Sequence, residues 1–228
     1  MKLPFTKEQF LEVFRKYNIT FFPLQLLFLL LAAYIIFLAV KGKRNRGSTI
    51  AISLGCLWLW MGAAYHLAFF TVINKAAYGF GALFLLQGIL LIVYGLKASP
   101  SFVFEKNLSG ILGSVLLFYA LIIYPLLGYA DGHGYPYSPT FGLPCPTTIF
   151  TLAIFLLAPN RLPFYIVAIP LLWSVIGFSA AFTLGIYEDT GLVVSALVFA
   201  ILHFTKPKRL TAKPAHKNIS AEMNHFVS

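Results

Sequence analysis

The chain is a succession of long apolar runs separated by short polar segments, and this pattern points to a fold that has the lipid bilayer as its solvent. A helix needs about 20 mostly apolar residues to cross a hydrocarbon core about 30 Å thick, because it rises about 1.5 Å per residue. With 59% hydrophobic and 11% charged residues, the chain has too few polar side chains to cover a soluble domain. We therefore predict an all-α integral membrane protein, a seven-transmembrane helix bundle. The candidate spans are 19–40, 48–73, 76–96, 108–129, a fifth that ends at residue 158, 164–182 and 191–204.

Residues 4–17 precede the first span and have the pattern of an amphipathic helix. Thr6 and Gln9 have the spacing of a capping box, and apolar residues then recur at helical spacing opposite charged ones. This segment is too polar to span a membrane. It either lies in the membrane interface with its apolar side down or packs against the bundle. The expected organisation is an N-terminal amphipathic segment at 1–18, a seven-helix domain at 19–204 and a basic tail at 205–228 that is disordered.

The basic residues predict the orientation of the bundle. The loop after the first span, the segment 97–106, Arg161 and the tail together hold twelve Lys or Arg, and the opposite side holds five. Because positive residues favour the cytoplasmic side, we expect the N-terminus outside and the C-terminus inside. The net charge of +10 then indicates contact with anionic headgroups at the inner face of the bilayer rather than with nucleic acid.

The stretch 124–150 is the one long interruption between apolar runs, and it limits where the fifth helix can begin. Between Pro146 and Pro159 there are only about twelve residues, or about 18 Å of helix, which cannot cross the hydrocarbon core. We therefore expect a broken or re-entrant segment before a helix that begins near Thr147, with its N-terminus facing an outer vestibule. The alternative is a helix that starts earlier, near Phe141.

Polar side chains of the outer half are the candidates for a ligand site. His66 is the first residue to examine, because ionisable groups inside a membrane are costly and usually functional. The full candidate set is His66, Tyr65, Asp131, His133, Cys145, Thr147, Thr148, Glu188 and Asp189. His66, His133 and Cys145 are weak candidates for a zinc or copper site, since they have no tight CxxC or HxxxH spacing.

The pattern predicts no cofactor. A retinal protein needs a lysine deep in its last span, and 191–204 has none. A bis-histidine haem needs two imidazoles at similar depth, whereas His66 is expected near the outer face and His203 near the inner one. The two cysteines are expected as free thiols on opposite sides, with Cys145 accessible from outside and Cys56 shielded about 12 Å inside the inner boundary.

Three classes of function remain open from these residues. The first is a small transporter or channel-like protein whose outer vestibule is formed by the central loop, the start of the fifth helix and His66. The second is a membrane-embedded enzyme or redox protein in which Cys145, its pKa lowered by a helix N-terminus, acts with His133 or His66; an enzyme is the less favoured reading. The third is a scaffold without a ligand, a possible homo-oligomer through the small-residue stripe of Gly81, Gly88 and Gly95.

Three segments also support a resemblance. These are PCPTTIFTL at 144–152, YPLLG at 124–128 and PFTKEQFLEVFRKYN at 4–18. With them the chain resembles an uncharacterised family of bacterial multi-pass membrane proteins, defined only as a domain of unknown function. The resemblance runs from Pro4 to about His203, and its most specific part is the proline-cysteine-proline-threonine segment. It implies a location in the bacterial cytoplasmic membrane and assigns no catalytic residues.

Overall fold

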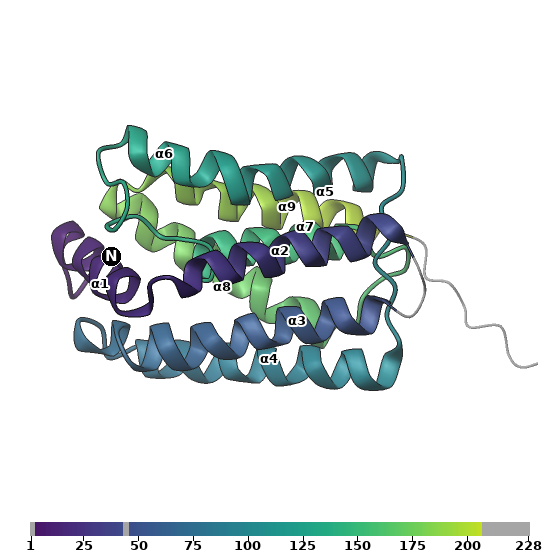
Figure 1. Cartoon of the computed structure of the whole chain (residues 1–228), viewed down its shortest axis with the longest axis horizontal. Helices are drawn as coiled ribbons and strands as arrows, with labels where there is room; N and C mark the ends of the chain where they lie inside the picture. Colours follow the sequence, from purple (N-terminus) through teal and green to yellow (C-terminus); the bar gives the residue numbers. More distant parts are fainter. Residues whose placement is uncertain (1–2, 43–45, 207–228) are drawn as a thin grey trace, which may run out of the picture.

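The computed structural model describes residues 3–42 and 46–206, and within these ranges the chain is all-α. The long helices lie side by side in a bundle, with α1 across one end (Figure 1). The predicted tail from residue 207 onward and residues 43–45 of the basic loop lie outside the described residues.

Six helical segments of the described residues are long and apolar enough to cross a membrane. Large apolar side chains on their outer surfaces are exposed, such as Leu30 at 66%, Leu96 at 68% and Phe182 at 78%, as expected if lipid surrounds the bundle. The segments are α2 (Leu24–Lys41), α3 with two short turns (Arg46–Val72), α4 (Ala77–Ala98), α5 to α6 (Leu108–Ala130), α8 (Phe164–Leu184) and a 3₁₀ turn with α9 (Tyr187–Thr205).

The fifth predicted span is the short helix α7 (Pro144–Leu156), so the described residues confirm six of the seven predicted spans as long enough to cross a membrane and leave the count of seven unconfirmed. The chain enters the bundle from the end that carries α1, and α7 then begins inside it (Figure 1). The helix starts at Pro144, before the expected Thr147 and after the alternative start at Phe141. Pro144 and Pro146 fit within the first turn, because the N–H groups that they lack would have no helical partner there.

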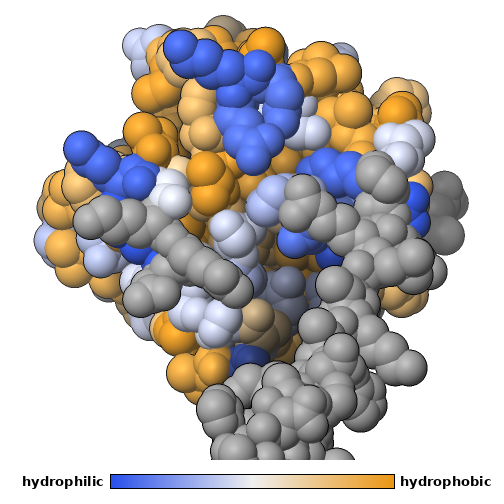
Figure 2. Space-filling view, turned by 90° about the vertical axis from the view of Figure 1, so that its right-hand side faces the viewer, coloured by the Kyte–Doolittle hydropathy of each residue, from blue (hydrophilic) through white to orange (hydrophobic). Residues whose placement is uncertain are grey.

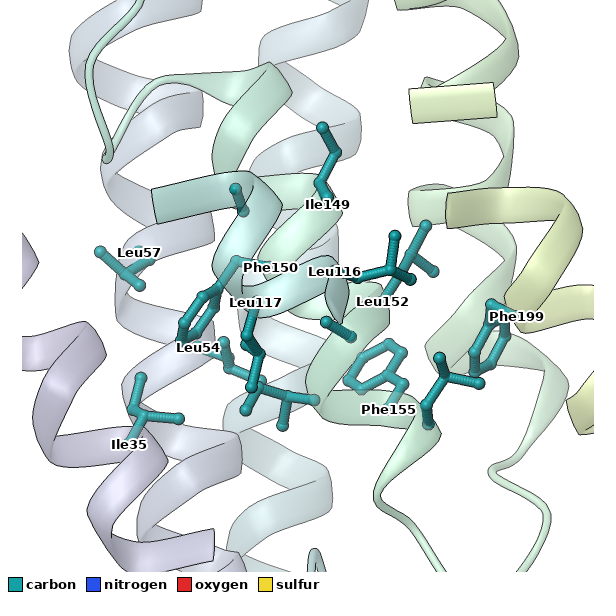
Figure 3. Close-up of a cluster of buried hydrophobic side chains, with 14 of the residues drawn as sticks. Ile35, Leu54, Leu57, Leu116, Leu117, Ile149, Phe150, Leu152, Phe155 and Phe199 are labelled. Atoms are coloured by element: carbon teal, nitrogen blue, oxygen red, sulfur yellow. The ribbon is translucent and has the colours of Figure 1, made fainter. Parts of the chain in front are cut away.

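All thirteen residues of α7 are buried, which makes it the central element of the core. It packs against α5, α8 and α9. Figure 3 shows Phe150 and Phe155 pointing to different sides of α7, Phe150 near Leu57 of α3 and Phe155 near Phe199 of α9. The long helices thus surround a short helix whose side chains are all buried.

Two of the long segments contain a π-helical turn. Met61–Leu67 (η1) continues α3 (Arg46–Trp60), and Tyr119–Ile123 (η3) lies between α5 (Leu108–Phe118) and α6 (Tyr124–Ala130). The second turn comes directly before Pro125, whose missing N–H interrupts the regular ladder, and such widened turns are frequent at functional sites. Both turns lie toward the end of the bundle that carries α1 (Figure 1).

The amphipathic helix α1 (Lys7–Phe21) packs against the end of the bundle, and its position in the membrane interface stays a prediction. Its N-terminus has the predicted capping box of Thr6 and Gln9. Phe10 and Phe14 are buried on its inner face and contact Phe70 and Tyr65, respectively. α1 extends beyond the predicted boundary at residue 18, and α2 begins only at Leu24, after Pro23.

The end of the bundle opposite α1 carries the basic loops. Val103 N–H donates to Leu157 O at 3.0 Å, and Lys206 Nζ donates to Ala158 O at 2.7 Å, so the turns after α4, α7 and α9 meet there. Figure 2 looks onto this end, where hydrophilic residues lie among apolar ones. The two sides that the sequence distinguishes by their number of Lys and Arg residues therefore correspond to the two ends of the bundle.

The small-residue stripe of α4 is used inside the chain. A Cβ added at Gly88 would lie 2.6 Å from Leu59 Cγ and 2.8 Å from the carbonyl oxygen of Gly55, both on α3. Gly81 and Gly95 meet η1 and α3 in the same way. The stripe is therefore not free to contact a second copy, contrary to the oligomer surface expected from the sequence.

Replacing Gly88 by alanine should destabilise the protein by about 1–3 kcal/mol, because the α3 backbone must move away from the new methyl group. Gly79 on the same helix is the matched control, since nothing lies within 4 Å of its Cβ position. Thermal unfolding in detergent should show a lower midpoint for Gly88→Ala and no loss for Gly79→Ala. Equal midpoints for the two variants would contradict the close α3–α4 packing.

Candidate functional site

An aromatic cavity of about 240 Å³ lies between α1 and the end of the bundle. α1 and the segment before it cover it, with Phe5, Phe10 and Phe14 in its wall. The opposite wall comes from η1, α4 and α8, and the chain that leads into α7 contributes a further part. The other lining residues are Leu3, Pro4, Tyr65, Phe70, Asn74, Ala76, Phe80, Pro139, Leu143, Pro144, Cys145, Trp173, Ile176, Gly177, Ser179, Ala180 and Asp189.

Asp189 supplies the carboxyl group of this cavity. It ends the 3₁₀ turn η4 (Tyr187–Asp189) directly before α9 (Thr190–Thr205), and only 2% of its surface is exposed. The Tyr124 hydroxyl donates a hydrogen bond of 2.5 Å to Asp189 Oδ1, and the Cys145 thiol lies beside the same carboxyl. Within residues 3–42 and 46–206, no Lys, Arg or His forms an ion pair with Asp189.

The neighbouring Glu188, in contrast, has a partner. His133 Nε2 and Glu188 Oε1 are 2.7 Å apart, and their side chains are 4% and 0% exposed. The hydrogen bond to the Glu188 carboxylate raises the pKa of His133 above its ordinary value. Tyr119 donates to the backbone oxygen of Glu188 at 2.6 Å, which fixes the η4 turn against η3.

Asn18 holds the central loop in place. Its Nδ2 donates to the carbonyl oxygens of Pro136 and Ser138 at 2.7 and 2.9 Å, and its Oδ1 accepts from the Thr140 hydroxyl at 2.8 Å. Asn18 is completely buried, so these bonds are made away from solvent. The end of α1 thereby positions the segment that leads into α7.

A second cavity of about 300 Å³ lies on the other side of this segment, between α2 and α6. Gln25 lines it, and its Oε1 has no hydrogen-bond partner while its Nε2 donates to Asn18 O. Its remaining lining residues are Phe22, Leu26, Leu29, Ala120, Leu121, Tyr124, Pro125, Tyr135, Pro139, Thr140, Phe141 and Pro146. Pro139 lines both cavities, so the chain into α7 is the wall between them.

His66 has a different setting from the one expected. It is completely buried on η1, and neither ring nitrogen has a partner. The rings of Phe84 and Trp173 lie 4.4 and 5.0 Å from it, and it lines neither of the two large cavities. Across the described residues, no group of three or more His, Cys, Asp or Glu is arranged to hold a metal ion. The weak candidates His66, His133 and Cys145 therefore do not form such a group.

The other predicted residues divide into two groups. Tyr65, Cys145 and Asp189 meet at the aromatic cavity, and Glu188 with His133 lies directly beside it. Asp131 is exposed and lines neither large cavity. Thr147 and Thr148 are buried in α7: the Thr147 hydroxyl accepts from Gly142 N–H at 3.0 Å, and the Thr148 hydroxyl has no partner.

Cys145 is more buried than the sequence suggested, whereas the shielding of Cys56 by lipid or helices stays a prediction. Both are free, but Cys145 is buried at 6% exposure and Cys56 is exposed on the side of α3. Cys145 lies in a regular first helical turn, so its backbone does not need the solvated surroundings that two flanking prolines suggested. No hydrogen bond joins Cys145 to His66 or His133 within the described residues, so the nucleophile and base of the enzyme hypothesis are not assembled.

Sequence reasoning missed Tyr124, Trp173 and Asn18. Tyr124 and Trp173 are ordinary residues of apolar runs, and Asn18 ends the amphipathic segment. The hydrogen-bond partners are remote in sequence: Tyr124 meets Asp189 across 65 positions, and Asn18 meets Ser138 across 120. The nearest signal was Pro125, which marks the interrupted helix that carries Tyr124. A buried acidic turn also requires donors, which Tyr119 and Tyr124 of the segment α5 to α6 supply.

Comparisons with curated proteins and with solved structures give no match. A family model matches residues 7–214, which is most of the chain. This agrees with the resemblance to an uncharacterised family that the sequence suggested. The chain therefore belongs to this family of unknown function (DUF6064).

Proposed function

We propose that the protein is a small multi-pass membrane transporter whose solute site is the aromatic cavity beneath α1. The observation that carries the proposal is a buried carboxyl group, Asp189, in a mostly apolar cavity beside a helix that begins inside the bundle. Discontinuous helices of this kind place substrate sites within membrane transporters. Irregular backbone at such depth is also tolerated only where protein or a cavity surrounds it.

The proposed orientation has the basic end of the bundle in the cytoplasm, against anionic headgroups, and the cavity end outside. The family resemblance favours the bacterial cytoplasmic membrane. The solute would then reach the cavity from the outer side. Its further route would follow the segment that leads into α7, where Pro139 separates the first cavity from the second.

The cavity volume limits the size of the solute. An engineered apolar cavity of about 150 Å³ holds benzene, so about 240 Å³ holds one ring with a short substituent. The lining is mostly aromatic and aliphatic, which favours a solute with an apolar body.

α1 acts as the cover of this site. Lys7 Nζ donates to Gly185 O at 3.1 Å and ties the start of α1 to the turn before η4. Phe10 and Phe14 fill the space between α1 and the bundle. Movement of α1 away from Tyr65 and Phe70 would widen the opening of the cavity, and we therefore expect α1 to be the mobile element of the proposed cycle.

A substitution that fills the cavity tests the proposal. Ala180 lines the cavity, so Ala180→Phe should occupy it, whereas Ala82→Phe places the same ring on the exposed side of α4. In proteoliposomes, we expect wild-type protein and Ala82→Phe to take up benzyltrimethylammonium or phenylmethanesulfonate faster than protein-free liposomes. Both probes are permanently charged and cross lipid slowly by themselves.

Ala180→Phe should reduce this uptake to the protein-free rate while unfolding at the same temperature as Ala82→Phe. The absence of protein-dependent uptake of both probes would overturn the transporter proposal. Uptake that survives in Ala180→Phe would place the solute path elsewhere.

A further inference from the structure

The aromatic cavity contains an acidic group that no cationic side chain accompanies. The lining includes Asp189 and no Lys, Arg or His. The adjacent Glu188 differs, because His133 is paired with it at 2.7 Å. A carboxylate buried without a counter-charge costs free energy, and a positively charged group entering the cavity would reduce this cost for Asp189. Glu188 does not have the same cost, because His133 is its partner.

The groups that touch Asp189 supply hydrogen bonds, and the nearby His133 is bonded to Glu188 and acts on Asp189 only through space. Tyr124 of α6 donates to Oδ1, Cys145 of α7 lies beside the carboxyl, and Glu188 precedes it in the same turn. On α1, the Lys7 ammonium donates to the Gly185 carbonyl oxygen at 3.1 Å and forms no ion pair with Asp189. The protein itself thus leaves the charge of Asp189 to be matched from the cavity.

The aromatic walls are suited to a cation with an apolar body. Tyr65, Phe70, Phe80 and Trp173 line the cavity, and the faces of such rings attract cations within about 6 Å of their centres. A positively charged group beside Asp189 would therefore lie among rings that also pack against its hydrocarbon part.

Trp173 gives a second, independent indication of a ligand. Its side chain is 93% buried, its indole N–H has no hydrogen-bond partner, and it lines the cavity. The indole nitrogen is 3.4 Å from the Cβ position that Gly177, another lining residue, leaves empty. Buried donors are rarely left unsatisfied, so an acceptor or a π-face is expected in this space when the site is filled.

From these observations we infer that the solute of the cavity is a small organic ammonium with one apolar ring, bound through its charged nitrogen to Asp189. The inference rests on the proposed function, since it names the class of solute for the same cavity. The ammonium donates to the carboxylate, and the ring lies between Phe80 and the aromatic side chains of α1. A carboxylate-bearing or uncharged solute of the same shape lacks the interaction with Asp189.

Three probes of one shape test this inference in detergent: 2-phenylethylammonium, 2-phenylethanol and phenylacetate. Binding is followed by the change in tryptophan fluorescence, because Trp173 lines the site. We expect the ammonium to bind about tenfold or more tightly than the alcohol, and phenylacetate to bind most weakly. Asp189→Asn should remove the advantage of the ammonium and leave the affinity for the alcohol within about threefold.

Asp131→Asn is the matched control, because it makes the same chemical change at an exposed position outside the cavity. Asparagine at position 189 keeps the acceptor for the Tyr124 hydroxyl, and the comparison of the three probes on wild-type protein gives a readout that needs no variant. Equal affinities for the ammonium and the alcohol would overturn the inference and leave the cavity as a binding site. If none of the three probes binds wild-type protein, the proposed site itself is wrong.

Discussion

Replacing Phe155 by alanine should lower the free energy of unfolding by about 3–5 kcal/mol, because the truncation opens a cavity at the centre of the bundle. Phe155 is completely buried on α7, between Phe102 and Phe199, whose ring centres lie 6.3 and 6.1 Å from its own (Figure 3). In a membrane, helices associate mainly through van der Waals packing, so burial of other apolar surface does not compensate for the contacts that the truncated side chain loses. Since α7 has no surface toward lipid, its position depends entirely on such contacts.

The measurement is the unfolding of purified protein in detergent micelles, with Phe118→Ala as the control. Phe118 has the same side chain near the middle of the segment α5 to α6, but it is 57% exposed on the outer surface. Its truncation should cost less than about 1 kcal/mol. If the two variants unfolded alike, α7 would not be the packed centre of the molecule.

The sequence was sufficient to predict the long helices because the length of an apolar run is a local property. α4, predicted at 76–96, is Ala77–Ala98, and α8, predicted at 164–182, is Phe164–Leu184. The shortness of α7 was predictable for the same reason, since Pro146 can lie no later than the first turn of the helix and Pro159 follows its end. Its start at Pro144 was not, because proline is accepted in a first turn as readily as before it.

The candidate site could be predicted only in part. Glu188 and Asp189 were recognisable as an acidic turn between two spans, but so was Asp131, which is exposed in the structure. Burial distinguishes these carboxyls, and it arises from non-local packing of η4 against α6 and α8. The different roles of the two acidic neighbours also depend on a remote residue, because His133 bonds to Glu188 across 55 positions.

This pair carries the last prediction. Replacing His133 by alanine should destabilise the protein by about 3–5 kcal/mol at about pH 6, because it leaves the Glu188 carboxyl buried without its partner. The double variant His133→Ala with Glu188→Gln should recover part of this loss, since the neutral amide is less costly to bury alone. Unfolding midpoints of the wild type, both single variants and the double variant give the coupling between the two side chains.

The pH dependence of the loss separates the charge of His133 from its packing. Because the folded-state pKa of His133 is raised above the ordinary value of 6.5, its contribution to stability is fully present below about pH 6.5. The contribution disappears as the pH rises through the folded-state pKa, where the imidazole becomes neutral in the folded protein as well. We therefore expect His133→Ala to cost less at about pH 9 than at about pH 6. An equal loss of stability at about pH 6 and about pH 9 would mean that His133 acts through its volume and not through its charge. Glu188 would then have no compensating charge either, and the contrast between Glu188 and Asp189 would disappear.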